Sequence, residues 1–224
     1  ERAEALKEVA RVASERMKRS PVPAESWQMV LDLQPGDREA LDALHALYEK
    51  DKQWEKLAEI LDRKAEVVDG DAERVKVLQL LGHVRGDRLK DAAAAIEIWQ
   101  RVLELVPDHS KGQEALKWAY IEARDWEALS EQYGARDAHK DLVRVLESQV
   151  GVVGETEVKV DLLRRAAEVW SDKLGDEDRA VRAIERFLRD YGDELDADRR
   201  AQVSSWKAEL EQELRPSTVS DFEV

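Results

Sequence analysis

The chain has 224 residues, of which 43% are hydrophobic and 38% charged, with a net charge of −14 and no cysteine. The lack of cysteine excludes disulfides, thiolate catalysis and zinc–thiolate sites, and it favours a reducing compartment such as the cytoplasm. The negative charge argues against a nucleic-acid partner, because phosphate binding needs clustered Lys and Arg.

Amphipathic helices are predicted along almost the whole chain. Apolar residues recur at spacings of three and four, as in Leu41, Leu44 and Tyr48, which is the helical period. Gly and Pro mark the breaks, and Asp stands where helix N-caps are wanted. The pattern predicts about twelve helices, near residues 2–19, 24–34, 37–51, 53–69, 71–87, 91–106, 109–123, 125–134, 138–151, 155–173, 176–192 and 196–214.

The C-terminal part differs from the rest. Residues 193–214 are predicted to contain a charged amphipathic helix with Trp206 and Leu210 on one face, which caps the preceding helices. Residues 215–224 have turn formers and no packing period, so a flexible tail is expected there. No apolar run reaches the 18 residues of a membrane span, and no secretion signal is present, so membrane insertion is not expected.

An internal duplication organises residues 1–192. Residues 1–61 match residues 73–133 without a gap, and about a third of the pairs are identical, which chance does not maintain over such a length. A third, partial copy over residues 142–192 matches the region from Leu57 at an offset of 85. Matching positions at the offset of 72 include Arg2/Arg74, Val12/Val84, Arg16/Arg88, Trp27/Trp99, Pro35/Pro107 and Trp54/Trp126.

The repeated unit is a pair of helices. The 72-residue period holds two pairs of about 36 residues, and one amphipathic pair cannot bury its apolar faces alone. Stacked antiparallel pairs bury them against each other. The sequence therefore predicts an all-α chain of stacked helix pairs.

Several residues resemble the tetratricopeptide repeat. "LLGHV", residues 80–84, is similar to the Leu-Gly of the family's first helix. Ala95, Trp99, Val102 and Pro107 resemble the Ala, aromatic, small apolar and closing Pro of its second helix, displaced by one residue. The resemblance covers the chain up to about residue 192. The arrangement of the repeats also looks like that of the multi-repeat proteins of GC-rich bacteria. It implies a right-handed α-solenoid whose first helices line a concave groove.

Catalytic patterns are not found, and neither an enzyme nor a cofactor or metal is expected. The chain has no Gly-rich phosphate loop. Acid pairs have no specificity, because acidic residues occur throughout the chain. The four histidines have no partners at metal-ligand spacing: His45, His83, His109 and His139.

The tryptophans divide into two groups. Four are pairwise equivalent in the repeat and are predicted to pack between helices: Trp27, Trp54, Trp99 and Trp126. Trp118 lies two positions after Leu116, about 200° round the helix, and so points away from the core face. Its counterpart in the first copy is Ala46. Packing of Trp118 on a neighbouring helix or on the insertion around Gly134 is the alternative to a role in binding.

By the family resemblance, the off-core positions of the first helices form a binding surface. An aromatic residue among charges on a concave wall is typical of a binding hot spot. The candidate residues are Trp118, Glu114, Lys111, Ile121, Gln79, His83, Arg164 and Glu168.

Three functions are compatible with these features. The leading hypothesis is a non-enzymatic scaffold that holds a peptide or helix of another protein, of basic or mixed charge, in the concave groove. The second is a structural spacer or self-assembly segment of a longer repeat protein. The third is the regulatory flank of an enzyme whose catalytic domain lies outside these residues.

Overall fold

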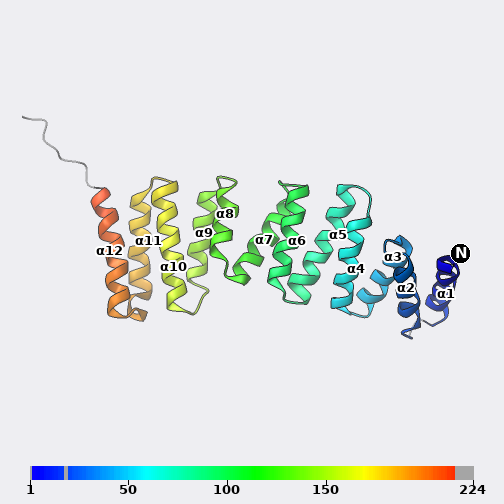
Figure 1. Ribbon diagram of the computed structural model, residues 1–224. Coiled ribbons are helices and arrows are strands. Elements are labelled where there is room, and N and C mark those ends of the chain that lie inside the picture. The colour runs from blue at the N-terminus through cyan, green and yellow to red at the C-terminus, as the bar shows by residue number, and fades with distance from the viewer. Residues whose placement is uncertain (1, 18–19, 215–224) are drawn as a thin grey trace, which may run out of the picture. The chain divides into compact units, whose positions relative to one another are not determined.

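The computed structural model describes residues 2–17 and 20–214, and within these ranges all regular structure is helical (Figure 1). The chain divides into two compact units, residues 1–125 and 126–224. The tail predicted for residues 215–224 lies outside the described residues.

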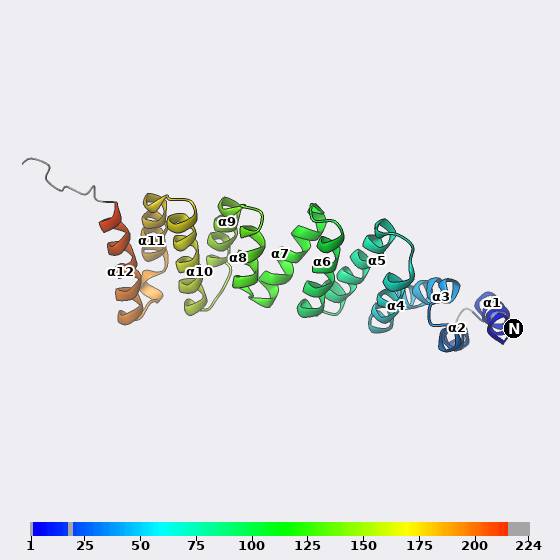
Figure 2. The ribbon, with the colours of Figure 1, turned by 45° about the horizontal axis from the view of Figure 1, so that its top comes forward.

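The first unit is a series of antiparallel helices in which each packs on the next along the chain (Figures 1 and 2). A short π-helical turn, η1 (Val84–Arg88), continues α5. The α-helices are α1 (Arg2–Arg16), α2 (Val22–Leu33), α3 (Arg38–Lys50), α4 (Trp54–Val67), α5 (Asp71–His83), α6 (Ala92–Leu105) and α7 (Ser110–Ala123).

The second unit repeats this arrangement with α8 (Trp126–Gly134), α9 (His139–Val150), α10 (Thr156–Glu168), α11 (Glu177–Tyr191) and α12 (Ala197–Glu213). A second π-helical turn, η2 (Val169–Lys173), follows α10, and a 3-10 turn (Gly192–Glu194) follows α11. The predicted capping helix is α12, which packs on α11.

The predicted fold class is confirmed in the described residues. They form twelve α-helices in sequential antiparallel pairs, close to the predicted boundaries. A continuous right-handed solenoid stays a prediction.

The internal repeat also appears in backbone details. The turns η1 and η2 lie 85 positions apart, which is the offset of the sequence match, and each is followed by a left-handed residue, Lys90 or Gly175. A π turn takes up one extra residue. This accounts for the one-residue displacement between "LLGHV" and Ala95. At the other offset, Lys52 and Arg124 share a left-handed conformation, with φ of 54° and 56°.

The tryptophans of the repeat mostly sit in the core as predicted. Trp27 and Trp99, on α2 and α6, are both buried in equivalent positions. Trp54 and Trp126 both begin their helices. Trp126 is buried, whereas Trp54 is half-buried and has the Arg88 guanidinium 5.1 Å from its ring centre.

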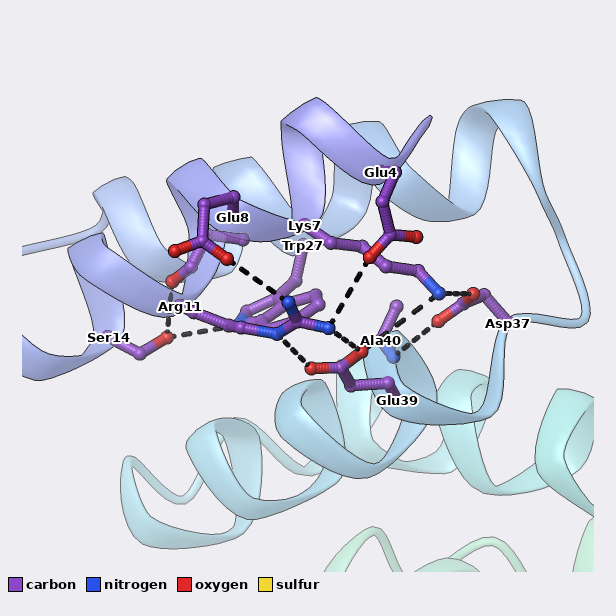
Figure 3. A network of polar contacts seen from close by, with 10 residues as sticks. Glu4, Lys7, Glu8, Arg11, Ser14, Trp27, Asp37, Glu39 and Ala40 are labelled. Atoms are coloured by element: carbon purple, nitrogen blue, oxygen red, sulfur yellow. Dashed lines mark hydrogen bonds and ion pairs between the residues drawn. The ribbon is translucent and has the colours of Figure 1, made fainter. Parts of the chain in front are cut away.

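A network of ion pairs joins α1 to the start of α3 (Figure 3). The Arg11 guanidinium donates to both carboxylate oxygens of Glu39, at 2.5 and 2.6 Å, and also contacts Glu8. Lys7 pairs with Asp37, whose carboxylate caps α3 by accepting from the backbone N–H of Ala40 at 3.0 Å. Polar contacts therefore fix which end of α3 meets α1.

The two carboxylates of this network are held ionised. The hydrogen bond from Arg11 lowers the pKa of Glu39, against a smaller effect of burial. Burial raises the pKa of Asp37, but Lys7 and the backbone N–H groups outweigh it, so this pKa is also lowered. A depressed pKa contributes stability at neutral pH that is lost as the pH falls through the folded-state pKa.

We therefore expect Glu39→Gln to weaken the attachment of α1 at pH 6 and to have little effect near pH 2. The difference arises because wild-type Glu39 becomes protonated below the usual carboxyl range of about pH 4. Amide hydrogen exchange of α1, measured across this pH range, tests it. The control is Glu55→Gln, which removes an exposed carboxylate of α4 outside the network. If the amides of α1 lose the same amount of exchange protection on acidification in wild type and in Glu39→Gln, the assignment is contradicted.

Candidate binding groove

A groove of about 670 Å³ lies in the first unit, between α5 with its π turn, α6 and α7. Its lining is of two kinds. The small residues are Gly82, Gly86, Ala92, Ala95, Ala115 and Ala119. The larger and polar residues are His83, Asp87, Trp99, Ser110, Lys111, Glu114, Trp118 and Glu122.

The hollow exists because the glycine and alanine positions of its lining carry little or no side chain. Gly82 lets α5 approach the indole of Trp99 so closely that an added Cβ would lie 2.7 Å from Trp99 Cε2. The His83 ring meets the same indole edge-on, with ring centres 5.3 Å apart. The side of α5 that faces the groove therefore packs against Trp99 of α6.

Trp118 is held in place while its surface stays open. It is 54% exposed. Its indole N–H donates to Glu114 at 2.9 Å, and the Lys117 ammonium lies 4.7 Å from its ring centre. The exposure favours the interpretation of Trp118 as a binding residue over packing on a neighbouring helix.

Glu114 carries a negative charge in the groove at neutral pH. Its hydrogen bond with Lys117 lowers its pKa, and the hydrogen bond from Trp118 adds to this against the effect of partial burial. One carboxylate thus positions both the aromatic ring and a cation beside it.

The first copy of the repeat differs from the second at two positions of the groove. Arg11 and Glu39, which form the bidentate bridge of Figure 3, correspond to His83 and Lys111. Two basic residues cannot form that bridge, and His83 pairs instead with Asp87 at 3.0 Å. The two positions that bridge α1 and α3 in the first copy therefore do not bridge α5 and α7 in the second.

The predicted site residues fall into three groups. His83, Lys111, Glu114 and Trp118 line the groove together. Gln79 is engaged outside it, with its amide nitrogen 2.8 Å from His109 Nε2, and Ile121 is half-buried and does not line the groove.

Arg164 and Glu168 lie in the second unit. They pair with each other at 2.6 Å and line a separate hollow of about 340 Å³ beside Trp206 and Leu210 of α12. Their place in one surface with Trp118 stays a prediction.

Sequence reasoning missed Asp87, Glu122 and the small residues of the groove. The spacing of Ala115, Trp118, Ala119 and Glu122 places them on one side of a helix, and that pattern was available. The hollow itself depends on contacts between helices, which no local pattern reports.

Within residues 2–17 and 20–214, no cluster of three His, Asp or Glu side chains suited to holding a metal ion occurs. In the same part of the chain, no helix combines the length and apolarity that crossing a membrane requires.

No protein-family model matches the chain, and no curated protein matches it in sequence. Among solved structures, it resembles the MamA protein, with 15% identity, coverage of 85% of this chain and 92% of that chain, and a TM-score of 0.38. It also resembles Pseudomonas aeruginosa pilF, with 17% identity, 92% and 82% coverage, and a TM-score of 0.37. The structure of Naa15/Naa10 bound to HypK-THB is similar at 14% identity, 96% and 35% coverage, and a TM-score of 0.36. Similarities of this size carry no argument about function.

We expect Gly82→Ala to destabilise the first unit by about 1–3 kcal/mol, because the new methyl group would overlap the Trp99 indole. Urea denaturation measures the change. Gly86→Ala is the matched control, since its Cβ would meet Ala95 at 3.4 Å, an ordinary contact. Equal stability of the two variants is the result that would contradict this packing.

Proposed function

We propose that this chain is a non-enzymatic interaction scaffold and that the groove between α5, α6 and α7 binds a peptide or helix of another protein. The observation that carries the proposal is the exposed, hydrogen-bonded Trp118 at a preformed hollow. A rigid aromatic side chain that is already oriented loses little entropy on binding, so its buried area converts into affinity.

The charges of the groove define the partner's chemistry. Asp87, Glu114 and Glu122 outnumber Lys111 among the charged lining residues. Carboxylates around a hollow attract cations and disfavour acidic partners. The proposed ligand is therefore a basic or mixed-charge peptide that places one bulky apolar side chain against Trp118.

Two alternatives remain from the sequence. A self-assembling spacer predicts a mass that rises with concentration, which light scattering on the chain would detect. A regulatory flank of an enzyme predicts activity elsewhere in a longer polypeptide. Cytoplasmic location is part of the proposal and rests on the lack of cysteine.

We expect Trp118→Ala to weaken peptide binding about tenfold or more, because it removes the aromatic anchor that lines the groove. Peptides selected from a displayed random library on the wild-type chain provide the ligands, and fluorescence polarisation measures their affinity. Leu80→Ala removes an exposed apolar side chain of α5 outside the groove and should leave binding unchanged. Selected peptides that are acidic, or that bind Trp118→Ala equally well, would refute the proposal.

A second variant closes the groove instead of removing its anchor. His83→Arg combined with Lys111→Glu restores the residue pair that bridges α1 and α3 in the first copy. We expect the double variant to keep its helical circular dichroism and to lose peptide binding. Unchanged affinity in this variant would show that the peptides bind elsewhere.

A further inference from the structure

Helix α11 carries four arginines on one side, although the chain as a whole has a net charge of −14. They follow one another at spacings of three, four and three residues, which places them on the same side of a helix. The row is about 15 Å long, because the helix rises about 1.5 Å per residue. The side chains are 55–72% exposed: Arg179, Arg182, Arg186 and Arg189.

The earlier copies of the repeat are acidic or uncharged at most of these positions. Helix α11 corresponds to α6 at the offset of 85, and α6 corresponds to α2 at the offset of 72. Only Arg186 has a basic counterpart, and its pair with Glu147 repeats the pair of Arg101 with Asp62. The other three arginines are therefore not required by the packing of the repeat. The counterparts are Ala94, Glu97, Arg101 and Glu104 in α6 and Val22, Glu25, Met29 and Asp32 in α2.

The exposure of this side of α11 does not follow from where the sequence begins or ends. Helix α11 packs on α10 before it and on α12 after it (Figure 1). Its counterpart α6 also has helices on both sides, α5 and α7, and Glu97 and Glu104 are exposed there too. This side of the second helix of a pair is therefore open to solvent even where further helices precede and follow it.

Two adjoining hollows lie beside the arginines. The larger, of about 590 Å³, is lined by all four of them together with Trp170, Glu147 and Glu185. Arg186 and Glu147 line both hollows, so the two meet at this ion pair, which is 3.0 Å long. The smaller, of about 160 Å³, has a mainly apolar lining: Val150, Leu163, Ala166, Ala183, Phe187 and Tyr191.

The smaller hollow lies where the last copy has smaller side chains than the copy before it. Ala166 and Ala183 correspond to Leu81 and Ile98, which are only 1% and 8% exposed. The ring of Phe187 takes up part of the space. Sites for small molecules usually measure about 300–1,000 Å³, so a hollow of this size suits a single apolar side chain better than a whole ligand.

The chemistry of the row suits carboxylates. A guanidinium has five N–H donors in a planar fork that matches a carboxylate. The existing pairs on α11 use one or two donors each, as in Arg179 with Asp176 at 3.1 Å. Exposed pairs of this kind are weak, so carboxylates of a partner can share or replace them. A nucleic acid is disfavoured, because the net negative charge of the chain repels its phosphates.

We propose that this surface, formed by the four arginines and the smaller hollow and called here the α11 surface, binds an acidic segment of another protein that inserts one apolar side chain. The carboxylates of the segment pair with Arg179, Arg182 and Arg189. Its apolar side chain lies against Ala166 and Ala183. The α11 surface lies in the second unit and shares no residue with the groove, so either proposal can fail without the other.

The test uses the full chain and a labelled peptide of sequence EEELEEE in fluorescence polarisation at low ionic strength. Arg182→Glu combined with Arg189→Glu should weaken binding about tenfold or more. The fold accepts Glu at both places, since α6 carries Glu97 and Glu104 there. The control is Lys50→Glu combined with Lys76→Glu, which makes the same change in net charge at exposed positions of the first unit and should leave affinity unchanged.

A second variant tests the smaller hollow while keeping every arginine. The peptide EEELEEE should bind the wild-type chain more tightly than EEEAEEE. Ala183→Ile restores the residue of α6 at this position, Ile98, and should abolish the difference between the two peptides by filling the hollow. Circular dichroism shows whether this variant is folded. A preference for leucine that persists in the folded variant would place the apolar side chain elsewhere and contradict that part of the proposal.

Three results would overturn the proposal. Equal affinity of EEELEEE for the wild-type and the charge-reversed α11 chains would place the peptide elsewhere. An oligothymidylate that binds as tightly as the peptide, and is lost in the same variant, would make the surface a nucleic-acid site. Tighter peptide binding by Phe222→Ala than by wild type would identify residues 215–224 as the occupant.

The two proposed sites are separated by their variants. Trp118→Ala should leave the binding of EEELEEE unchanged, and its loss there would assign this peptide to the groove and overturn the proposal for α11. An acidic library peptide that no longer binds the charge-reversed α11 chain belongs to the α11 surface and does not count against the groove.

Discussion

The whole arrangement depends on apolar stripes that antiparallel neighbours bury against one another. Leu41 and Leu44 of α3 and Leu78 of α5 are almost fully buried, and each such side chain contributes about 1.5–3 kcal/mol when removed from water. An exposed ion pair is typically worth about 0–1 kcal/mol. The abundant charges therefore contribute little to holding the helices together. They determine which surfaces meet, as the bridge between Arg11 and Glu39 does for α1 and α3.

Because the core positions are shared, the copies differ in the polar positions between them. Lys7 pairs with Asp37 in the first copy, and the equivalent Gln79 and His109 form a side-chain hydrogen bond in the second. His109 still caps its helix by accepting from the Gly112 N–H, as Asp37 does from Ala40. The cap is thus kept by different chemistry. One helical turn further along α5, the ion pair of Arg11 and Glu39 is replaced by two basic residues, His83 and Lys111. The groove lies at that place.

The helices and their pairing could be predicted because they follow from apolar periodicity and from breakers, which are local. The prediction that Trp118 points away from the core followed from the same helical geometry, because its angle from Leu116 places it off the core face. The groove could not be predicted, because it arises where Gly82 meets Trp99 across two helices. The family resemblance indicated that first helices line one surface, but it did not indicate that Gln79 would be engaged by His109, or that Arg164 lies in another compact unit.

The π turns have a consequence for how such an array changes over evolutionary time. An extra residue in a regular helix would rotate everything after it by about 100°. In η1 the surplus is absorbed within one turn at the end of α5, and Trp99, on the separate helix α6, is buried. The length of the elbow between paired helices is thereby uncoupled from the phase of the stripe. An insertion at this point is therefore expected to disturb the packing of the apolar stripes less than an insertion inside α5.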